Sequence, residues 1–286
     1  MTTNPTTIKT WGEALDYTWR VKWKRKNSAK TNAINSGHVT NYCGRSLPLK
    51  RMTVAGWWLE FKAEMEDEGR SGSTINRILS AGTTVMKFTQ LAGLHTYACP
   101  KFERADEGEH RLTYFTKDQI THLASIARDI YDRQDMADAI VFSAYTGVRQ
   151  GELLKLRSTD VDLARSILWV GGKPKQLVTK AKNCRSIPLH PLVQPIIENR
   201  LDRTYLFRDD WSNKDQLYRL FKKVRAQAGI TEDHVWHTLR HSFGTFLGET
   251  THPRQIMALM GHSNVETSLR YVKATDDACR SAVMAI

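Results

Sequence analysis

The alternation of apolar and polar residues that marks a half-buried strand is convincing at only one place in this chain. The runs SILWVGG and QLVTKAKNCRSIPLH are short apolar segments separated by a polar turn that carries lysines, which predicts a hairpin in a small antiparallel sheet. Elsewhere, apolar residues recur at helical spacing. The sequence therefore predicts a mainly α protein: a helical N-terminal module joined to an α+β domain with one small antiparallel β-sheet.

The chain has 286 residues, more than one compact core usually contains, so two domains are expected. Residues 1–95 have the periodicity of a small helical bundle, and this periodicity is lost afterwards, where a proline and an acidic cluster appear. We expect a helical domain over 1–95, a linker over 96–112, a second domain over 113–273 and a tail over 274–286. The tail resembles a short amphipathic helix.

Several helix ends can be placed from local signals. Thr53 is expected to cap a helix that ends at Gly69, and Thr116 with Gln119 forms a capping box. The apolar helix MADAIVFSAYTG is expected to end at Gly147. The helix after the capping box presents one apolar stripe, formed by Ile120, Leu123, Ala127 and Ile130.

The sequence has none of the signals of a membrane or secreted protein. It contains no apolar run of ~18 residues, and its first residues lack the charged and apolar regions of a secretory signal. Its cysteines are far apart and form no C-x-x-C pair, which favours ordinary thiols in a reducing compartment over disulfides or zinc. We expect a cytoplasmic protein. The cysteines are Cys43, Cys99, Cys184 and Cys279.

Positive charge is in excess and unevenly distributed. Lysine and arginine number 42 against 30 acidic residues, a formal charge of +12, and no acidic residue occurs between Asp16 and Glu60. A basic stretch of this kind attracts a polyanion such as DNA by releasing its counterions. A solvated surface or a binding site for acidic proteins would have the same composition. The residues that we single out for DNA binding are Arg20, Lys22, Lys24, Arg25, Lys26 and Lys30.

Two short motifs could together bind a phosphodiester. In HTLRH, residues three and four apart share a helix face, so His237, Arg240 and His241 should project together. In YTGVRQGELLKL, Arg149 would begin a helix, and Glu152 could hold its guanidinium in one orientation. Each motif alone is as well explained by a surface pair. Two rigidly held arginines, however, can grip the two non-bridging oxygens of one phosphate.

A phosphate held in this way can be attacked by a hydroxyl, and LMGHSNVETSLRYVKAT offers Tyr271, nine positions after His262. A phenol has a pKa of about 10, so this tyrosine needs a nearby base or a cationic pocket. The product would be a phosphotyrosine ester. A lysine on the hairpin could protonate the leaving 5′-oxygen; Lys180 fits, and Lys182 is its rival.

These motifs, in this order and at these intervals, resemble the tyrosine recombinases, and among them the integrases of temperate phages. The matching elements are T-G-x-R-x-x-E-L, T-K before SIPL, H-x-L-R-H and L-x-G-H-S…Y, which together cover residues 112–273. Upstream, TINRILSAGTTVMKFTQLAG is similar to the last helices of the family's core-binding (SAM-like) domain. The resemblance implies a site-specific DNA recombinase that integrates or excises DNA.

The resemblance also implies a role for each matching residue. Arg149 and Arg240 would clamp the scissile phosphate, His262 would contact a non-bridging oxygen, and Glu152 would be a supporting carboxylate. No cofactor or metal would be needed, since the arginines supply the positive charge.

For the proton transfers, the resemblance implies that Tyr271 forms a 3′-phosphotyrosine with help from His237, and that Lys180 is the general acid. His241 matches a common family residue that more often packs or forms hydrogen bonds than catalyses.

The expected partners also follow from the resemblance: double-stranded DNA held in a clamp of the two domains, and a homo-tetramer on paired sites, with a monomer or weak dimer when free. The tail would pack on a neighbouring protomer, and an accessory directionality or DNA-bending factor would fit. Since the helical module is expected to begin near residue 8, we expect a simpler member without the additional arm-binding domain of many phage integrases.

Four alternatives stay open. Two are a resident Xer-like recombinase and a transposon recombinase. The third is a type IB topoisomerase, which uses the same chemistry but religates the original strand. The fourth is a DNA-binding protein on a decayed recombinase scaffold, although all six catalytic positions are filled.

Overall fold

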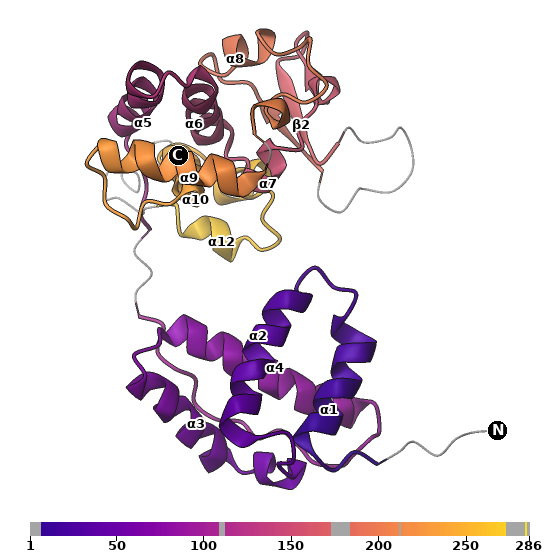
Figure 1. Ribbon diagram of the computed structural model, residues 1–286. Helices are drawn as coiled ribbons and strands as arrows, with labels where there is room; N and C mark the ends of the chain where they lie inside the picture. Colours follow the sequence, from indigo (N-terminus) through magenta and orange to yellow (C-terminus); the bar gives the residue numbers. More distant parts are fainter. Residues whose placement is uncertain (1–6, 109–111, 173–183, 212, 273–283, 285–286) are drawn as a thin grey trace, which may run out of the picture. The chain divides into compact units, whose positions relative to one another are not determined.

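The computed structural model describes residues 7–108, 112–172, 184–211, 213–272 and 284. The chain divides into two compact units, residues 1–110 and 111–286 (Figure 1). The described part is mainly helical with one small antiparallel sheet, as the sequence predicts. Lys180, Lys182 and nearly all of the expected tail lie outside the described residues. None of the described helices is both long and apolar enough to cross a lipid bilayer.

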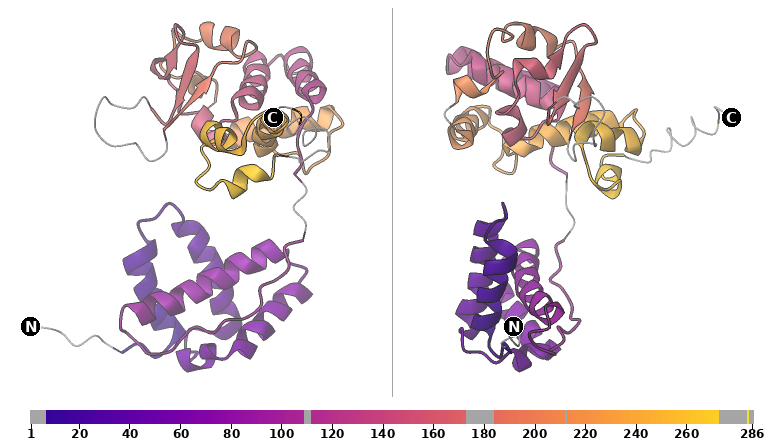
Figure 2. Two further views of the ribbon diagram at one scale, coloured as in Figure 1. Left: turned by 180° about the vertical axis from the view of Figure 1, so that it is seen from behind. Right: turned by 90° about the vertical axis from the view of Figure 1, so that its right-hand side faces the viewer.

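The described part of the first unit is built from helices alone, and the long central one, α4, contacts three others (Figure 2). Its apolar face, which includes Ile75 and Leu79, packs in a core with the fully buried rings of Trp11 and Trp58. The elements are α1 (Trp11–Thr18), the π-helical turn η1 (Trp19–Trp23), α2 (Ala29–Cys43), the 3-10 turn η2 (Leu49–Thr53), α3 (Ala55–Asp67) and α4 (Gly72–Leu91).

One local expectation for this unit is wrong. Thr53 does not cap α3: it ends the preceding 3-10 turn, where its hydroxyl donates to the Lys50 carbonyl at 2.7 Å. Val54 takes the N-cap position and forms no side-chain cap. In the π-helical turn, Trp23 is buried in the core, whereas Val21 is 54% exposed.

The segment after α4 contains no helix or strand in its described residues 96–108, which we expected to belong to the linker. Much of it packs on the first unit. The ring of Phe102 stacks on Trp58 with 5.1 Å between centroids. Asn76 donates to the Ala105 carbonyl and accepts from its backbone N–H at 2.9 and 3.0 Å.

The six basic residues singled out above lie on the π-helical turn, in the turn that follows it and at the start of α2. Lys22 lies over the Phe88 ring at 4.6 Å, and Arg20 over Tyr17 at 5.7 Å. The other four, Lys24, Arg25, Lys26 and Lys30, are exposed, and the described residues hold no ion pair to any of the six. Their charge therefore faces solvent.

The second unit joins helices to a three-stranded sheet with strand order β1-β2-β3. The predicted hairpin is confirmed: β2 and β3 pair antiparallel, with Val170 opposite Arg185. The two-residue strand β1 was not predicted, because two residues are too few to show alternation. The described elements are α5 (Lys117–Ser125), η3 (Ile126–Ile130), α6 (Gln134–Thr146), α7 (Gln150–Leu153), η4 (Ser158–Asp160), β1 (Val161–Asp162), β2 (Ile167–Val170), β3 (Arg185–Pro188), α8 (Gln194–Glu198), η5 (Arg208–Asp210), α9 (Lys214–Gln227), α10 (Trp236–Gly248), α11 (Pro253–Met260) and α12 (Glu266–Leu269).

The capping box of Thr116 and Gln119 is present at the start of α5. The apolar stripe that follows is buried except for Ile130, which is 58% exposed. The chain changes from α to π geometry after Ser125, so a residue placed by α-helical spacing no longer falls on the inner face.

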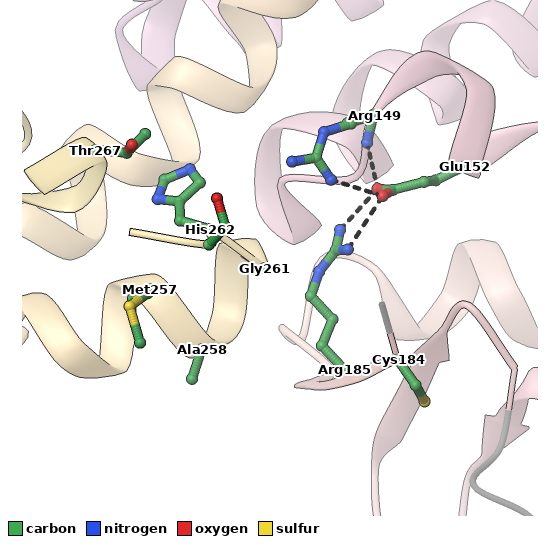
Figure 3. Close-up of a pocket in the computed structure, with 10 residues that line it drawn as sticks. Arg149, Glu152, Cys184, Arg185, Met257, Ala258, Gly261, His262 and Thr267 are labelled. Atoms are coloured by element: carbon green, nitrogen blue, oxygen red, sulfur yellow. Dashed lines mark hydrogen bonds and ion pairs between the residues drawn. The ribbon is translucent and has the colours of Figure 1, made fainter. Parts of the chain in front are cut away.

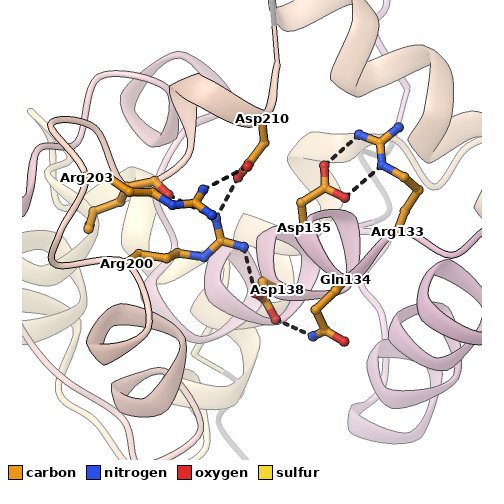
Figure 4. A network of polar contacts seen from close by, with 8 residues as sticks. Arg133, Gln134, Asp135, Asp138, Arg200, Arg203 and Asp210 are labelled. Carbon is orange, nitrogen blue, oxygen red and sulfur yellow. Dashed lines mark hydrogen bonds and ion pairs between the residues drawn. The ribbon is translucent and has the colours of Figure 1, made fainter.

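A network of charged side chains fastens α6 to the segment after α8 (Figure 4). The buried guanidinium of Arg200 donates to Asp138 of α6 at 2.7 Å and to Asp210 at 2.6 Å. Arg203 completes the network on Asp210 at 2.8 Å. The charges of this network are paired, as buried charges must be. The network thereby joins α6, which ends just before Gly147, to the segment after α8.

Gly147 ends α6 in the left-handed conformation, with φ of 63°. A Cβ there would lie 2.3 Å from Cδ1 of Phe243. We expect Gly147→Ala to lower the free energy of unfolding by about 2–4 kcal/mol, from backbone strain plus overpacking, as measured by urea denaturation.

Gly151→Ala is the matched control. Gly151 lies in α7, and a Cβ there meets no atom within 4 Å. Alanine should leave stability unchanged or raise it by up to about 1 kcal/mol, because it favours the helix. Equal effects of the two substitutions would contradict the assignment of Gly147 as a required glycine.

Candidate active site

Polar side chains of the second unit form a cluster of Arg149, Glu152, Arg185, His237, Arg240, His241, His262 and Tyr271. Arg240 lies on α10 and is only 3% exposed. Its Nη1 donates to the carbonyl of Gly147, which caps α6, at 2.6 Å, and its Nη2 donates to the carbonyl of Met260, the last residue of α11. Carbonyls at helix C-termini lack intrahelical partners and carry partial negative charge. One buried guanidinium therefore ties the ends of two helices to a third.

Beyond each of these helix ends, a left-handed glycine turns the chain toward the cluster. Gly147 is followed two residues later by Arg149, the N-cap residue of α7. Gly261 is followed directly by His262, whose backbone N–H donates to Met257 at 3.0 Å. The T-G-x-R and G-H motifs thus share one local structure. In each, a left-handed glycine ends a helix and the next residues place a side chain in the cluster.

Glu152 lies between two guanidinium groups (Figure 3). It accepts from Nη1 and the backbone N–H of Arg149, each at 2.8 Å. It also accepts from both terminal nitrogens of Arg185, at 3.1 and 2.7 Å. Burial alone would raise the pKa of Glu152, but the hydrogen bonds from Arg185 and Arg149 outweigh it and lower the pKa to about 2. The predicted pair with Arg149 is present, and the pair with Arg185 was not predicted.

His262 is held by Ser268, whose hydroxyl lies 2.8 Å from Nδ1. Its ring is nearly parallel to that of Tyr271, with centroids 6.1 Å apart. Partial burial and the positive charges of Arg240 and Arg149 lower the pKa of His262 to about 4, so the ring is neutral near pH 7.

Tyr271 is 6% exposed and rests on two glycines of α10. A Cβ on Gly244 would lie 2.7 Å from Cε1 of the ring, and one on Gly248 would lie 2.0 Å from the Tyr271 carbonyl oxygen. The tyrosine can therefore approach α10 only because these positions lack a side chain. Burial raises the pKa of Tyr271, although the charges of Arg240 and Arg270 oppose the shift.

The hydroxyl of Tyr271 is in hydrogen-bond contact with His241, 2.8 Å from Nδ1. Burial, together with the charge of neighbouring His237 and of Arg270, lowers the pKa of His241 to about 4. The ring of His237 lies edge-on against His241 with 4.8 Å between centroids and is exposed. Near pH 7 the group on the tyrosine hydroxyl is therefore a neutral imidazole.

A cavity of about 680 Å³ lies beside this cluster (Figure 3). Arg149, Glu152 and Arg185 line it from one side and His262 from another. Tyr271 and Arg240 are not among its lining residues. An anion that enters the cavity can therefore contact the Arg149 guanidinium.

The structure brings together five of the six expected catalytic residues and the supporting Glu152 in the second unit. The sixth, Lys180, and its rival Lys182 lie outside the described residues. Within the described residues no group of three or more His, Cys, Asp or Glu side chains is placed to hold a metal ion.

Arg185 is the member of the cluster that the sequence analysis missed. The signal was present in the hairpin: strand alternation places Arg185 on the same face as the buried Ile187. An arginine is rarely buried unless its charge is paired, so an arginine at an inward strand position favours a partner elsewhere in the fold.

The model of the phage integrase family matches residues 113–278, more than half of the chain. The chain belongs to the phage integrase family. Its members are site-specific tyrosine recombinases, enzymes that break and rejoin DNA strands.

Similar proteins of this family include two tyrosine recombinases of nearly the same length as the matched part of this chain. A tyrosine recombinase of Thermosipho africanus is 25% identical over 91% of this chain and 93% of its own length. The tyrosine recombinase XerA of Thermococcus onnurineus is 28% identical over 89% of this chain and 88% of its own length.

Solved structures share the recombinase fold. The Tn1549 transposon integrase in complex with transposon right-end DNA matches with a TM-score of 0.76 and 20% identity, over 97% of this chain and 99% of that one. A lambda integrase dimer bound to a core site matches with a TM-score of 0.72 and 15% identity, over 94% of this chain and 78% of that one.

The low pKa of His241 predicts a pH dependence of this recombinase's stability. The unfolded chain takes up a proton below about pH 6.5, whereas His241 in the folded state stays neutral down to about pH 4. The stability present above pH 6.5 is therefore lost as the pH falls toward 4. In urea denaturation at pH 7 and pH 5, His241→Gln should lose less stability on acidification than the wild type. Equal losses would show that His241 titrates freely in the folded protein.

Proposed function

We propose that this chain cleaves double-stranded DNA with Tyr271 as the nucleophile and forms a 3′-phosphotyrosine intermediate. The observation that carries the proposal is the placement of Tyr271: its hydroxyl contacts the neutral His241, and its ring lies beside His262 in a cluster organised by Arg240. A phenol with an adjacent acceptor and cationic neighbours is the arrangement that a phosphoryl transfer without a metal requires.

In the proposed reaction, Arg149 and Arg240 bind the scissile phosphate and His262 contacts one of its non-bridging oxygens. Arg149 is half-exposed at the cavity, and its Nε and Nη2 make no hydrogen bond within the described residues. These donors suit a phosphate oxygen. Glu152 orients the guanidinium through its Nη1.

The transfer forms a bond between the tyrosine oxygen and phosphorus and breaks the bond from phosphorus to the 5′-oxygen. The phenol proton passes to His241, which contacts the hydroxyl, and His237 lies next in line against the His241 ring. The 5′-oxygen takes a proton from Lys180 or Lys182. Attack by another 5′-hydroxyl reverses these steps and rejoins the strand.

The proposed partners are double-stranded DNA and further copies of this chain in a homo-tetramer on paired sites, with an accessory directionality or DNA-bending factor. Support comes from the similarity to a lambda integrase tetramer bound to a Holliday junction, at a TM-score of 0.71 and 15% identity. The exposed basic residues of the first unit give a surface suited to phosphate contacts.

We further propose that the chain is a phage or prophage integrase, which inserts or excises viral DNA in the cytoplasm of a bacterial host. A resident or transposon recombinase is the second candidate. The curated relatives XerA and XerC, at 28% identity, favour the resident role, and the Tn1549 integrase favours the transposon role.

The first prediction from the proposed reaction concerns the nucleophile. On a nicked suicide duplex carrying a candidate attachment core, the wild type should form a covalent protein–DNA adduct that survives a denaturing gel. Tyr271→Phe should form none, because it lacks the attacking oxygen. Tyr145→Phe, in the same unit, is the matched control and should behave as the wild type.

An adduct with Tyr271→Phe would move the nucleophile elsewhere. Specific binding with no adduct from any variant would favour a DNA-binding protein. Relaxation of plasmids that lack any specific site would favour a topoisomerase.

A second prediction concerns the basic residues of the first unit. Replacing Lys24, Arg25 and Lys26 with alanine should weaken DNA binding and make the slope of log affinity against log salt shallower, by about 0.9 for each phosphate that the variant no longer neutralises. Lys62→Ala, which removes a charge already paired with Glu66, is the control and should change the slope little. An unchanged slope in the triple variant would place the DNA contacts on other residues.

A further inference from the structure

Arg185 is more deeply buried than any other charged member of the cluster except Arg240, with 8% of its surface exposed. Both terminal nitrogens are used on Glu152, and its buried Nε has no hydrogen-bond partner in the described structure. Burying a guanidinium in this way is costly unless its counter-ion is held closely. The pair with Glu152 is therefore what allows the charged Arg185 side chain to be buried here.

The ion cluster contains one carboxylate for two guanidinium groups. With Arg149 alone, Glu152 would form a neutral pair and would attract that side chain away from any bound anion. With Arg185 present, the three groups together keep one net positive charge. Arg185 donates to Glu152 through both of its terminal nitrogens, whereas the Arg149 guanidinium donates to Glu152 through Nη1 alone.

Arg185 also joins parts of the site that are far apart in the sequence. It begins β3, directly after the segment that bears Lys180 and Lys182. A Cβ on Gly261, the residue before His262, would lie 3.1 Å from Cδ of Arg185. The side chain therefore fills the space between the strand and the turn that presents His262.

We infer that Arg185 is a positioning residue, which balances the charge of Glu152 so that the three groups keep a net positive charge and Arg149 keeps its free donors for a phosphodiester. This inference rests on the proposed function of the site. Arg185 does not need to touch the DNA, because it acts through Glu152.

A double-substitution cycle tests the inference in the full chain. Arg185→Met should slow adduct formation on the suicide duplex by about tenfold to a hundredfold, because Glu152 then holds Arg149 without competition. Adding Glu152→Gln to this variant removes the unbalanced negative charge. The double variant should therefore recover to about the rate of Glu152→Gln alone.

A purely structural role would give a different pattern. If Arg185 only filled space, the two substitutions would add, and the double variant would be no faster than Arg185→Met; this result would overturn the inference. Arg185→Lys keeps the charge without the planar fork and should retain more activity than Arg185→Met. Urea denaturation of each variant separates loss of folding from loss of rate.

The pH profile gives a further readout that packing alone would not change. In Arg185→Met, Glu152 loses its principal cationic partner, so its pKa should rise from about 2 and the carboxylate should be protonated more readily. The rate of Arg185→Met relative to the wild type should therefore increase once the pH falls into the range in which the Glu152 carboxyl of the variant titrates. A constant ratio through that range would contradict neutralisation as the role of Arg185.

A measurement without DNA keeps this inference separate from the proposed function. Absence of any adduct from the wild type would count against the function, and carbon-13 NMR of the Glu152 carboxyl would then decide on Arg185. Its pKa should rise by about one unit or more in Arg185→Met, with Glu152→Gln used to assign the signal. An unchanged pKa would overturn the inference.

Discussion

The site depends on one buried guanidinium. Arg240 donates to the carbonyls at the C-terminal ends of α6 and α11, and both helices end in left-handed glycines. Because Arg149 comes two residues after Gly147 and His262 comes two residues after Met260, fixing the two carbonyls also fixes where the two side chains leave the backbone. The charge network of Arg200 holds the body of α6 from another side, so the same helix is constrained both along its length and at its end.

The balance of charge in this cluster has a consequence for its chemistry. The positive groups Arg149, Arg185 and Arg240 surround a single carboxylate, Glu152. Burial and the neighbouring cations lower the pKa of Arg240 to about 10, which still leaves it charged near pH 7. Burial first, and then the neighbouring positive charges, also lower the pKa of His241 and of His262 to about 4, so both rings are neutral near pH 7. The cluster is therefore prepared for an anion and retains uncharged imidazoles as proton acceptors.

Much of this arrangement could be predicted from the sequence, because it follows local rules. Helical periodicity, the capping box of Thr116 and the hairpin each depend on residues close together in the chain. The errors arose where the local rule changes, as at Ile130, where the helix becomes π-helical. Arg185 was missed for a different reason: its partner Glu152 is 33 residues away, and no local pattern specifies a buried ion pair between a strand and a helix. The seat of Tyr271 on Gly244 and Gly248 likewise depends on a contact between distant segments.

In the contact between Tyr271 and His241, the direction of proton transfer depends on the proton affinities of the two side chains. A histidine with a pKa of about 4 is a weak acceptor, and burial makes the phenol a weak donor, so the pair alone favours the neutral hydroxyl. Burial is the largest cause of the low pKa of His241, and the positive charges of Arg270 and Arg240 lower it further. A phosphodiester bound by the arginines would offset those charges and raise the proton affinity of His241. In the proposed function, the substrate itself would then strengthen the base that activates the nucleophile, and a tyrosine without bound DNA would stay protonated and unreactive.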